Sequence, residues 1–363
     1  MTGLTIHGWN VLCGAGTGYR ALLDALDGAR PASPVAAGRA VSTLCEDPPP
    51  RPDGHALAEF DVRAELGRKG TSTLDRGTAL ALVSVRDTLA DGAVLVNDET
   101  RARTGVAFGT TMGSLKSTSD YSAETLRQDR PYLVNPMLFP NTVMNRAAAQ
   151  VAIWFGLKGV NATVAGGPLA FLHTLRYAGQ ALRNQYADVM IAGVVEEFTA
   201  HSAWLHERAR GSAAPPPGEG AASFALRRSG PGDAEVLSVT TGFSPDGGPA
   251  RMERCLRRAL ADADVQPDDI ALIITGDTGS DDVETTAVRA VLGRHDDRML
   301  HVQRAFGDCQ AATGGLQLAA ALALHRDDPS RDGQLTVLTA HTPAGGVGAA
   351  VVRGWSRAGT DRG

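Results

Sequence analysis

The chain has 363 residues, of which 43% are hydrophobic and 21% are charged, and its formal net charge at pH 7 is -5. This length allows one large fold or two packed halves, and the apolar content is sufficient for a deep core. The mildly acidic balance gives no electrostatic footprint for nucleic acid or for an anionic membrane. No apolar run reaches membrane-spanning length.

The N-terminus and the cysteines indicate a cytoplasmic protein. Residues 1–4 lack the charged-then-apolar pattern of a secretory signal. The cysteines, Cys13, Cys45, Cys255 and Cys309, are scattered, with no CxxC pair and no histidine at ligand spacing. Such thiols are typical of a reducing compartment and not of a disulfide framework or a zinc site. We therefore expect neither a metal nor a cofactor.

Short apolar runs, typical of strands, alternate with longer segments of helical periodicity. The first part of the chain predicts strands at 4–12, 104–108, 161–164, 187–193 and 221–226, and helices at 19–26, 73–91, 147–155 and 169–184. A Pro-rich break at 213–218 precedes the strand at 221–226, and the pattern starts again near residue 229, with strands at 234–241, 270–275, 335–338 and 349–352, and helices at 250–261, 282–292 and 313–325. This repeat predicts two similar α/β halves, 1–228 and 229–357, followed by a tail at 358–363.

Several segments follow one another in an order typical of one enzyme family. They include GVAFGT at 105–110, NPMLFPN at 135–141, FGLKG at 155–159, ADVMIAG at 187–193 and GGVGAA at 345–350. On these segments, which span nearly the whole chain, the protein resembles β-ketoacyl synthases of the thiolase fold. The resemblance implies an α/β, thiolase-like fold with two similar halves in a layered α-β-α-β-α arrangement.

The chain departs from that family at the catalytic positions. An active member needs a cysteine at the start of a buried helix, where the helix dipole favours the thiolate, and two histidines that stabilise the enolate. Alignment with the family places Pro168, Gly276 and Asp308 at these positions. Proline has neither a nucleophilic atom nor the N–H that would serve the oxyanion hole, although it fits the first turn of a helix well. Gln303 and Ala344 replace the family's lysine and gating phenylalanine.

A ketosynthase-like chain without catalytic residues resembles the chain-length factor, or ketosynthase β subunit, of type II polyketide synthases. The resemblance implies a non-catalytic subunit that pairs with a ketosynthase α subunit through residues 105–160, works with an acyl carrier protein, and shapes the acyl tunnel. Many such subunits have glutamine at the position of Pro168, and this departure leaves room for highly reduced or polyene products. Ordinary packing is the alternative role for the candidate tunnel and interface residues, which are Thr111, Met112, Leu115, Met137, Leu138 and Phe139.

Two other functions remain open at this point. The chain could act alone on acyl thioesters through an atypical site at Cys309, with His301 or His341 as the base. Free cysteines are, however, more often small buried hydrophobic residues. A homodimeric scaffold that binds acyl carrier protein without catalysis is the third possibility.

Two local motifs admit a second interpretation. Asp281, Asp282 and Glu284 resemble a metal cluster, but Asp281 and Glu284 also have the spacing of a capping box at a helix start, which we favour. The glycines of segment 14–18 mimic a dinucleotide-binding loop. Their third glycine is misplaced for that role, so we interpret the segment as a strand-to-helix turn.

Overall fold

The computed structural model describes residues 3–30, 38–41, 44–277, 283–293 and 296–357. Within these ranges no helix has both the length and the apolar character needed to cross a membrane. Asp281, Asp282 and the predicted tail at 358–363 lie outside the described residues.

The first half of the described chain contributes one run of strands in the order β1-β8-β7-β5-β6. The outer three strands of this run, β7, β5 and β6, are parallel, and β8 pairs antiparallel with both β1 and β7. Because each parallel connection needs a crossover, helices lie between these strands in the sequence. The strands are β1 (Leu4–Cys13), β5 (Thr104–Thr110), β6 (Asn161–Ala165), β7 (Val189–Glu196) and β8 (Gly220–Arg227).

The second half repeats this topology. Its strand order is β9-β13-β12-β10-β11, again with three parallel outer strands and an antiparallel strand, β13, between β9 and β12. Strand β1 also pairs with β9 over Leu4–Ile6, so hydrogen bonds join the two runs. The strands are β9 (Ala234–Phe243), β10 (Ile270–Thr275), β11 (Met299–His301), β12 (Leu335–His341) and β13 (Gly346–Gly354).

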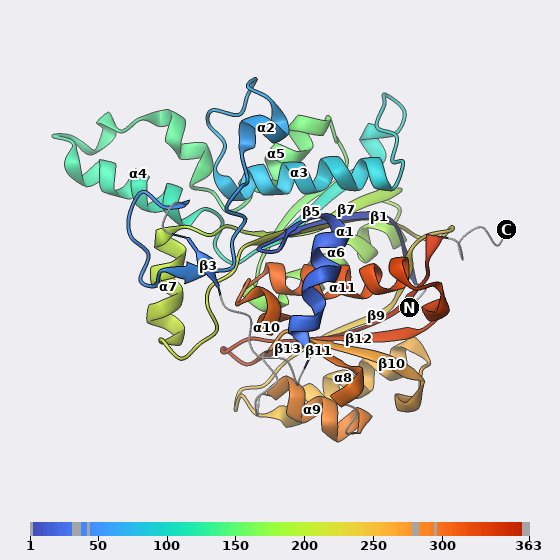
Figure 1. Cartoon of the computed structure of the whole chain (residues 1–363). Helices are drawn as coiled ribbons and strands as arrows, with labels where there is room; N and C mark the ends of the chain where they lie inside the picture. Colours follow the sequence, from blue (N-terminus) through green and yellow to red (C-terminus); the bar gives the residue numbers. More distant parts are fainter. Residues whose placement is uncertain (1–2, 31–37, 42–43, 278–282, 294–295, 358–363) are drawn as a thin grey trace.

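Helices lie on both faces of each run of strands, giving five layers (Figure 1). One outer layer contains α3 (Arg76–Asp91) and α5 (Arg146–Phe155), and the other contains α8 (Pro249–Ala263) and α9 (Val283–Leu292). The middle layer contains α1 (Gly18–Ala25), α6 (Ala170–Arg183) and α11 (Ala312–Asp327). The predicted α/β fold of two similar halves in a layered arrangement is confirmed. The division after residue 228, in the connection between β8 and β9, stays a prediction.

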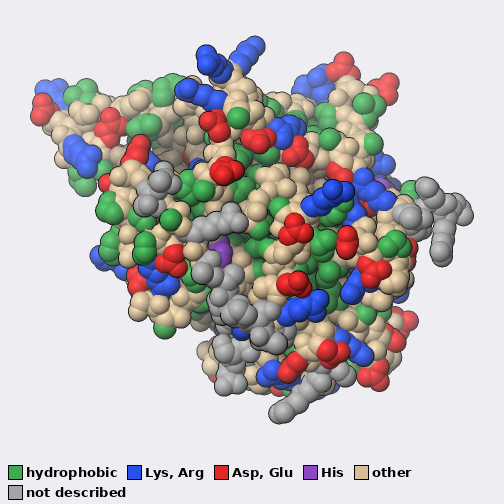
Figure 2. Space-filling view, in the orientation of Figure 1, with side chains coloured by type: hydrophobic (Ala, Val, Ile, Leu, Met, Phe, Trp, Pro, Cys, Tyr) green, Lys and Arg blue, Asp and Glu red, His purple; other side chains and the backbone are tan. Residues whose placement is uncertain are grey.

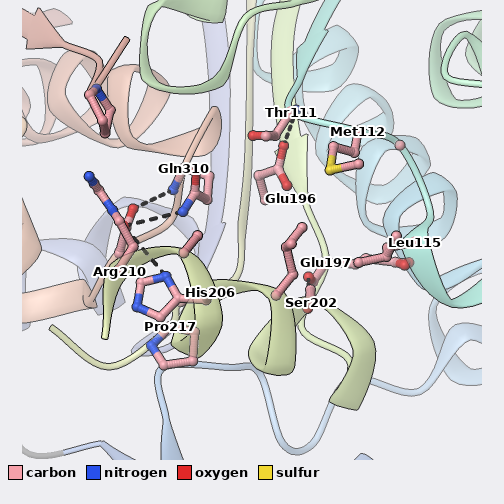
Figure 3. Close-up of a pocket in the computed structure, with 16 residues that line it drawn as sticks. Thr111, Met112, Leu115, Glu196, Glu197, Ser202, His206, Arg210, Pro217 and Gln310 are labelled. Carbon is pink, nitrogen blue, oxygen red and sulfur yellow. Dashed lines mark hydrogen bonds and ion pairs between the residues drawn. The ribbon is translucent and has the colours of Figure 1, made fainter. Parts of the chain in front are cut away.

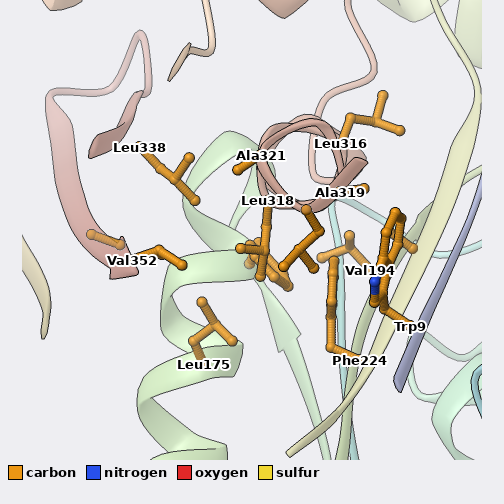
Figure 4. Packing of buried hydrophobic residues seen from close by; sticks show 14 of the residues in the cluster. Trp9, Leu175, Val194, Phe224, Leu316, Leu318, Ala319, Ala321, Leu338 and Val352 are labelled. Atoms are coloured by element: carbon orange, nitrogen blue, oxygen red, sulfur yellow. The ribbon is translucent and has the colours of Figure 1, made fainter. Parts of the chain in front are cut away.

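The middle layer forms the centre of the hydrophobic core. Helix α11 is buried along almost its whole length, as its Ala-rich sequence allows (Figure 4). Its glycines permit close approach to the neighbouring elements, since a Cβ on Gly314 would lie 2.8 Å from the Cβ of Phe171 and one on Gly315 would lie 2.5 Å from a methyl group of Val194. The start of α11 is therefore held firmly against α6 and β7.

The sequence did not predict two helices at one end of the molecule. Helix α4 (Leu115–Arg127) has no fully buried residue, and α7 (Ala200–Arg210) has three. Both sequences, LKSTSDYSAETLR and AHSAWLHERAR, are mostly polar, so few apolar residues mark either segment as a packed helix. Together with the chain that follows it, α4 projects from the layered body (Figure 1). The remaining short elements are β2 (Gly16–Thr17), β3 (Arg39–Ala40), β4 (Asp53–Gly54), α2 (Val62–Leu66) and α10 (Val302–Phe306).

Candidate functional site

The positions matched to the family's catalytic residues lie on segments around the first turn of α11. Pro168 is on a 3₁₀ turn, η6 (Gly167–Leu169), which leads into α6 and contacts α11 and β12. Gly276 follows β10, and a Cβ on it would lie 3.4 Å from the Thr313 methyl group in α11. Asp308 is in the loop before α11. The fold therefore brings all three positions to the same end of one helix.

Pro168 is in the first turn of the helical segment. The preceding Gly167 has φ +54°, a left-handed conformation that suits glycine, and the 3₁₀ turn continues directly into α6. A proline here sacrifices no intrahelical hydrogen bond, because an N–H in the first turn has no partner within the helix. The same residue supplies neither a nucleophile nor an N–H donor, so this turn cannot reproduce a cysteine site.

The Glu284 carboxylate contacts the backbone at Gly276. The Gly276 N–H donates to Glu284 Oε2 at 2.9 Å, and Thr339 Oγ1 donates to the same oxygen at 2.6 Å. Glu284 is buried at the start of α9. This carboxylate fixes the backbone after β10, and it acts as a structural acceptor. Of the predicted acidic cluster, Asp281 and Asp282 lie outside the described residues, and among the described residues no group of three potential metal ligands is found.

Asp308 is held by several polar partners. Its carboxylate accepts hydrogen bonds from Arg210 Nη2 at 3.2 Å, from the Gln310 N–H at 3.0 Å and from Gln310 Nε2 at 3.2 Å. His206 Nδ1 lies 3.6 Å from the same carboxylate. Asp308 is buried, so these contacts compensate the loss of water around its charge. The residue that the sequence aligns with the family's second histidine is thus an ion-paired carboxylate in the structure.

Next to Asp308 lies a pocket of about 310 Å³, shown in Figure 3. One part of its wall is apolar and contains Met112, Leu115, Leu205 and Pro343. The rest is polar and combines residues from the ends of β5, β7 and α7 with the loop before α11. The polar lining residues are Thr111, Glu196, Glu197, Ser202, His206, Arg210, Asp308 and Gln310.

Two adjacent glutamates at the end of β7 have raised pKa values. Burial raises the pKa of Glu196 to about 7, although hydrogen bonds from Thr111 and Thr110 oppose the change. Burial, followed by the charge of Asp75, raises the pKa of Glu197 to about 8. Glu197 accepts from the Gly77 N–H at 3.0 Å and from Ser114 Oγ at 2.8 Å. The pocket therefore contains carboxyl groups that titrate near neutral pH.

The six candidate tunnel and interface residues fall into two groups. Thr111, Met112 and Leu115 line the pocket. Met137, Leu138 and Phe139 are on a separate 3₁₀ segment, η5 (Pro136–Asn141), and are not among the residues that line it.

Segment η5 belongs to an exposed apolar surface. We call this surface the interface patch. Figure 2 shows hydrophobic side chains interspersed with charged ones on the projection that α4 and the following chain form. Met137 and Phe139 are 61% and 54% exposed, values unusual for large apolar side chains in a group. The interface patch consists of Tyr132, Leu133, Met137, Phe139, Val143 and Met144.

Cys309 has the environment of a core thiol. Its Sγ donates to the carbonyl oxygen of Phe306 at 3.2 Å, and the side chain is fully buried. Burial raises the pKa of the thiol well above its usual value, which disfavours the nucleophilic thiolate. His301, one proposed base, lies 2.9 Å from Asp277 Oδ1 and 2.7 Å from Thr275 Oγ1 through Nδ1. His341, the other, ends β12 and is half-buried.

Several polar residues of the pocket lining were not predicted from the sequence, including Glu196, Glu197, His206 and Arg210. One signal was present, because two glutamates directly follow the buried run 190–195 at the carboxyl end of a strand. The other two residues are on α7, which was not predicted.

Comparisons with family models and with curated proteins identify the same family. Residues 6–239 match the family model for the β-ketoacyl synthase N-terminal domain, and residues 238–328 match that for the C-terminal domain. Among curated proteins, 3-oxoacyl-[acyl-carrier-protein] synthase 2 of Coxiella burnetii is 24% identical over 75% of this chain and 74% of its own length. The corresponding protein of Vibrio cholerae is 28% identical over 38% of this chain and 33% of its own.

Solved structures agree with this family. A chain of the ishigamide ketosynthase/chain length factor is 32% identical, with a TM-score of 0.87 over 98% of this chain and 100% of that one. A chain of AntDE:AntF, a type II polyketide synthase acyl-carrier protein in complex with its ketosynthase, is 15% identical, with a TM-score of 0.77 over 97% of this chain and 99% of that one. The second likeness concerns the fold alone.

Proposed function

The chain belongs to the β-ketoacyl synthase family, and from this premise we propose that it is the non-catalytic chain-length-factor subunit of a ketosynthase heterodimer. In this role it pairs with a catalytic ketosynthase α subunit and shapes the tunnel in which a polyketide chain grows. The observation that carries the proposal is that Pro168, Gly276 and Asp308, which the sequence aligns with the family's catalytic positions, each have a local structural role.

These replacements act together against condensation. Acyl transfer needs a nucleophile and donors aimed at the oxygen that becomes negative, and Pro168 supplies neither. Decarboxylative condensation develops negative charge on the enolate, which the carboxylate at Asp308 would repel. The alternative nucleophile, Cys309, is disfavoured by its burial and its raised thiol pKa. Catalytic groups must then come from another subunit.

The first half of the chain offers a surface for such a subunit. Strand β6 is at the edge of its sheet, and all five of its residues are exposed or half-buried. An uncovered edge strand presents unpaired backbone donors and acceptors, and a partner strand can satisfy them. The interface patch lies in the same crossover, between β5 and β6. We propose that the catalytic subunit covers both, within residues 105–160.

The partners follow from the role of the subunit. The ishigamide relative is a ketosynthase/chain length factor, and the AntDE:AntF structure contains an acyl carrier protein with its ketosynthase. We propose that an acyl carrier protein likewise delivers chains to the complex that this protein forms. Proline in place of the glutamine common in chain-length factors leads us to place it with systems that make highly reduced or polyene chains.

Reconstitution with a ketosynthase that has the cysteine and both histidines tests the proposal. We expect a 1:1 complex on gel filtration and, with acyl carrier protein substrates, acylation of the partner alone by mass spectrometry. Met112→Trp should shorten the products, because Met112 lines the pocket and blocked burial disfavours each added CH₂ by about 0.8 kcal/mol. Met112→Ala should lengthen them.

Leu138 provides an informative comparison, since it is outside the pocket lining. Leu138→Trp should shorten the products only if the partner completes a tunnel over η5. A stable acyl adduct on this chain, or turnover by the chain alone, would contradict the proposal and favour a stand-alone enzyme. A homodimer that binds acyl carrier protein and ignores the ketosynthase would favour a scaffold.

A further inference from the structure

The pocket beside Asp308 borders the outside of the molecule at Met112, a residue of the segment 105–160 that we assign to the partner. Met112 lines the pocket and is also 46% exposed, so it separates the pocket from the outside. The volume of about 310 Å³ is at the lower end of the range for ligand pockets, which is about 300–1,000 Å³. The pocket therefore has room for the end of a chain and not for a whole extended one.

Glu196 gives this pocket a defined hydrogen-bonding character. One of its oxygens, Oε1, accepts from the Thr111 N–H and also from Thr110 Oγ1, at 3.2 Å for the latter. Because Oε1 is occupied as an acceptor, the proton of the neutral acid resides on Oε2. Figure 3 shows the side chain between Met112 and Gln310, facing the pocket. The neutral side chain therefore presents an O–H donor beside an apolar wall.

A buried histidine in the wall, His206, has one ring nitrogen without a hydrogen bond. His206 is 5% exposed, and its Nε2 lies 3.0 Å from the Pro215 carbonyl oxygen, which can only accept, so Nε2 carries a proton. Nδ1 has no hydrogen-bond partner and is 3.6 Å from the Asp308 carboxylate. Leaving a buried polar atom unpaired is costly. A polar group inside the pocket would relieve this cost, whereas a hydrocarbon end would not.

We propose that the pocket binds the far end of the acyl chain and selects an end that carries oxygen, as a hydroxyl or a carbonyl, over a plain methyl end. This inference rests on the proposed function, in which the chain reaches this subunit from the partner. The apolar wall of Met112, Leu115 and Leu205 takes the last methylenes, and Glu196 donates to the terminal oxygen. Sites with buried polar groups reject analogues that leave those groups unpaired.

The test uses the reconstituted heterodimer and two substrates of equal carbon number, octanoyl and 7-hydroxyoctanoyl chains on acyl carrier protein. The measured quantity is the ratio of kcat/KM for elongation of the hydroxy chain to that of the plain chain. At pH 6 we expect a ratio of about three to ten, as one net hydrogen bond provides. A 7-oxooctanoyl chain, which accepts without donating, should give a similar ratio because Glu196 is the donor.

Substitutions at Glu196 test whether this residue causes the preference for the hydroxy chain. Glu196→Leu should bring the ratio to one or below, whereas Glu196→Gln keeps an acceptor for Thr111 and an N–H donor for the pocket, and should preserve it. Glu253→Leu, on α8 in the opposite outer layer, is the control and should leave the ratio unchanged. If Glu196→Leu fails to assemble with the ketosynthase, the comparison of Glu196→Gln with the wild type still tests whether Glu196 is the source of the preference.

That comparison is made across pH. For the 7-oxooctanoyl chain, the wild-type ratio to the plain chain should fall between pH 6 and 8.5, because Glu196, whose pKa is raised to about 7, loses its donor proton on ionising and a carbonyl end cannot donate to the carboxylate that remains. The Glu196→Gln ratio should stay flat. Glu197, His206, Asp308 and Arg210 also face the pocket, so a pH dependence that persists in Glu196→Gln would assign the effect to them and overturn the role of Glu196.

The results that would contradict oxygen selection differ from those that would contradict the chain-length-factor role. A wild-type ratio of one, in a complex that forms and elongates both chains, would overturn oxygen selection and leave the chain-length-factor role intact. If the chain forms no complex with a ketosynthase, both proposals fall together.

Discussion

Strands β6 and β11 occupy the same place in the two halves, each at the outer edge of its run of strands, and they are covered differently. All three residues of β11 are buried, beneath a 3₁₀ turn, η1 (Leu26–Ala29), that also packs against α10. The five residues of β6 are exposed or half-buried. The crossover before β11 contains α9, whereas that before β6 contains α4, the interface patch and α5.

The contrast shows how one topology can serve two purposes. Natural proteins generally protect sheet edges, since an uncovered edge invites pairing with another chain. In the second half, η1 from the N-terminal part of the chain covers the edge strand β11. In the first half, the edge strand β6 stays exposed or half-buried, and exposed apolar side chains lie in the crossover that precedes it. Stability of the free chain should therefore depend on the cover of β11, and assembly should depend on the surface beside β6.

The first expected effect is on assembly. Phe139→Asp places a charge in the interface patch, and we expect the Kd for the ketosynthase partner to rise at least tenfold, which corresponds to about 1.4 kcal/mol. Leu95→Asp is the matched control, because Leu95 is 67% exposed but lies outside the patch. Titration calorimetry of both variants would measure the difference. If both substitutions raised the Kd equally, or if Phe139→Asp left it unchanged, the interface patch would not be part of the interface with the ketosynthase.

A second effect should appear in the stability of the free chain. Leu26 on η1 is buried in the central core, and Leu26→Ala would weaken the cover of β11. We expect a loss of about 2–5 kcal/mol in the free energy of unfolding, the usual cost of removing a buried leucine side chain. Denaturant titration should show this loss, while Phe139→Asp should stay within about 0.5 kcal/mol of the wild type. If both change stability alike, the two regions do not differ as described.

A third effect is the pH dependence of stability, which should have opposite signs in the two halves. Glu197 has a pKa raised to about 8, so the folded state binds its proton more tightly than the unfolded state does, and stability falls as pH rises from about 5 to 8. We expect a contribution on the order of 2 kcal/mol, which Glu197→Gln should remove in unfolding experiments across that range.

Asp277, after β10, should behave in the opposite way. Burial alone would raise its pKa, but the hydrogen bond and charge of His301 outweigh burial and lower it. Its contribution is therefore present above the ordinary carboxyl pKa and is lost as pH falls through the lowered value. Asp277→Asn should destabilise the chain at pH 7 and have less effect in acid. The same pH slope for both variants would contradict these assignments.

The sequence by itself determined the alternation of strands and helices and the two similar halves. It could do so because buried strands such as β7 and β10 are continuous apolar runs, and helices such as α6 have a clear apolar face. The prediction that Pro168, Gly276 and Asp308 stand at the family's catalytic positions also came from sequence, and it stays a prediction. Chemistry alone shows that proline and glycine cannot replace a cysteine and a histidine there.

Only the tertiary structure decided what surrounds these positions. Helix α7 has a polar sequence with no apolar stripe, so neither it nor the approach of His206 and Arg210 to Asp308 could be foreseen. Glu196 has a raised pKa because packing buries it, and no local sequence pattern encodes that burial. The different covering of β6 and β11 likewise depends on contacts between segments far apart in the chain, whose meeting is a property of the folded molecule.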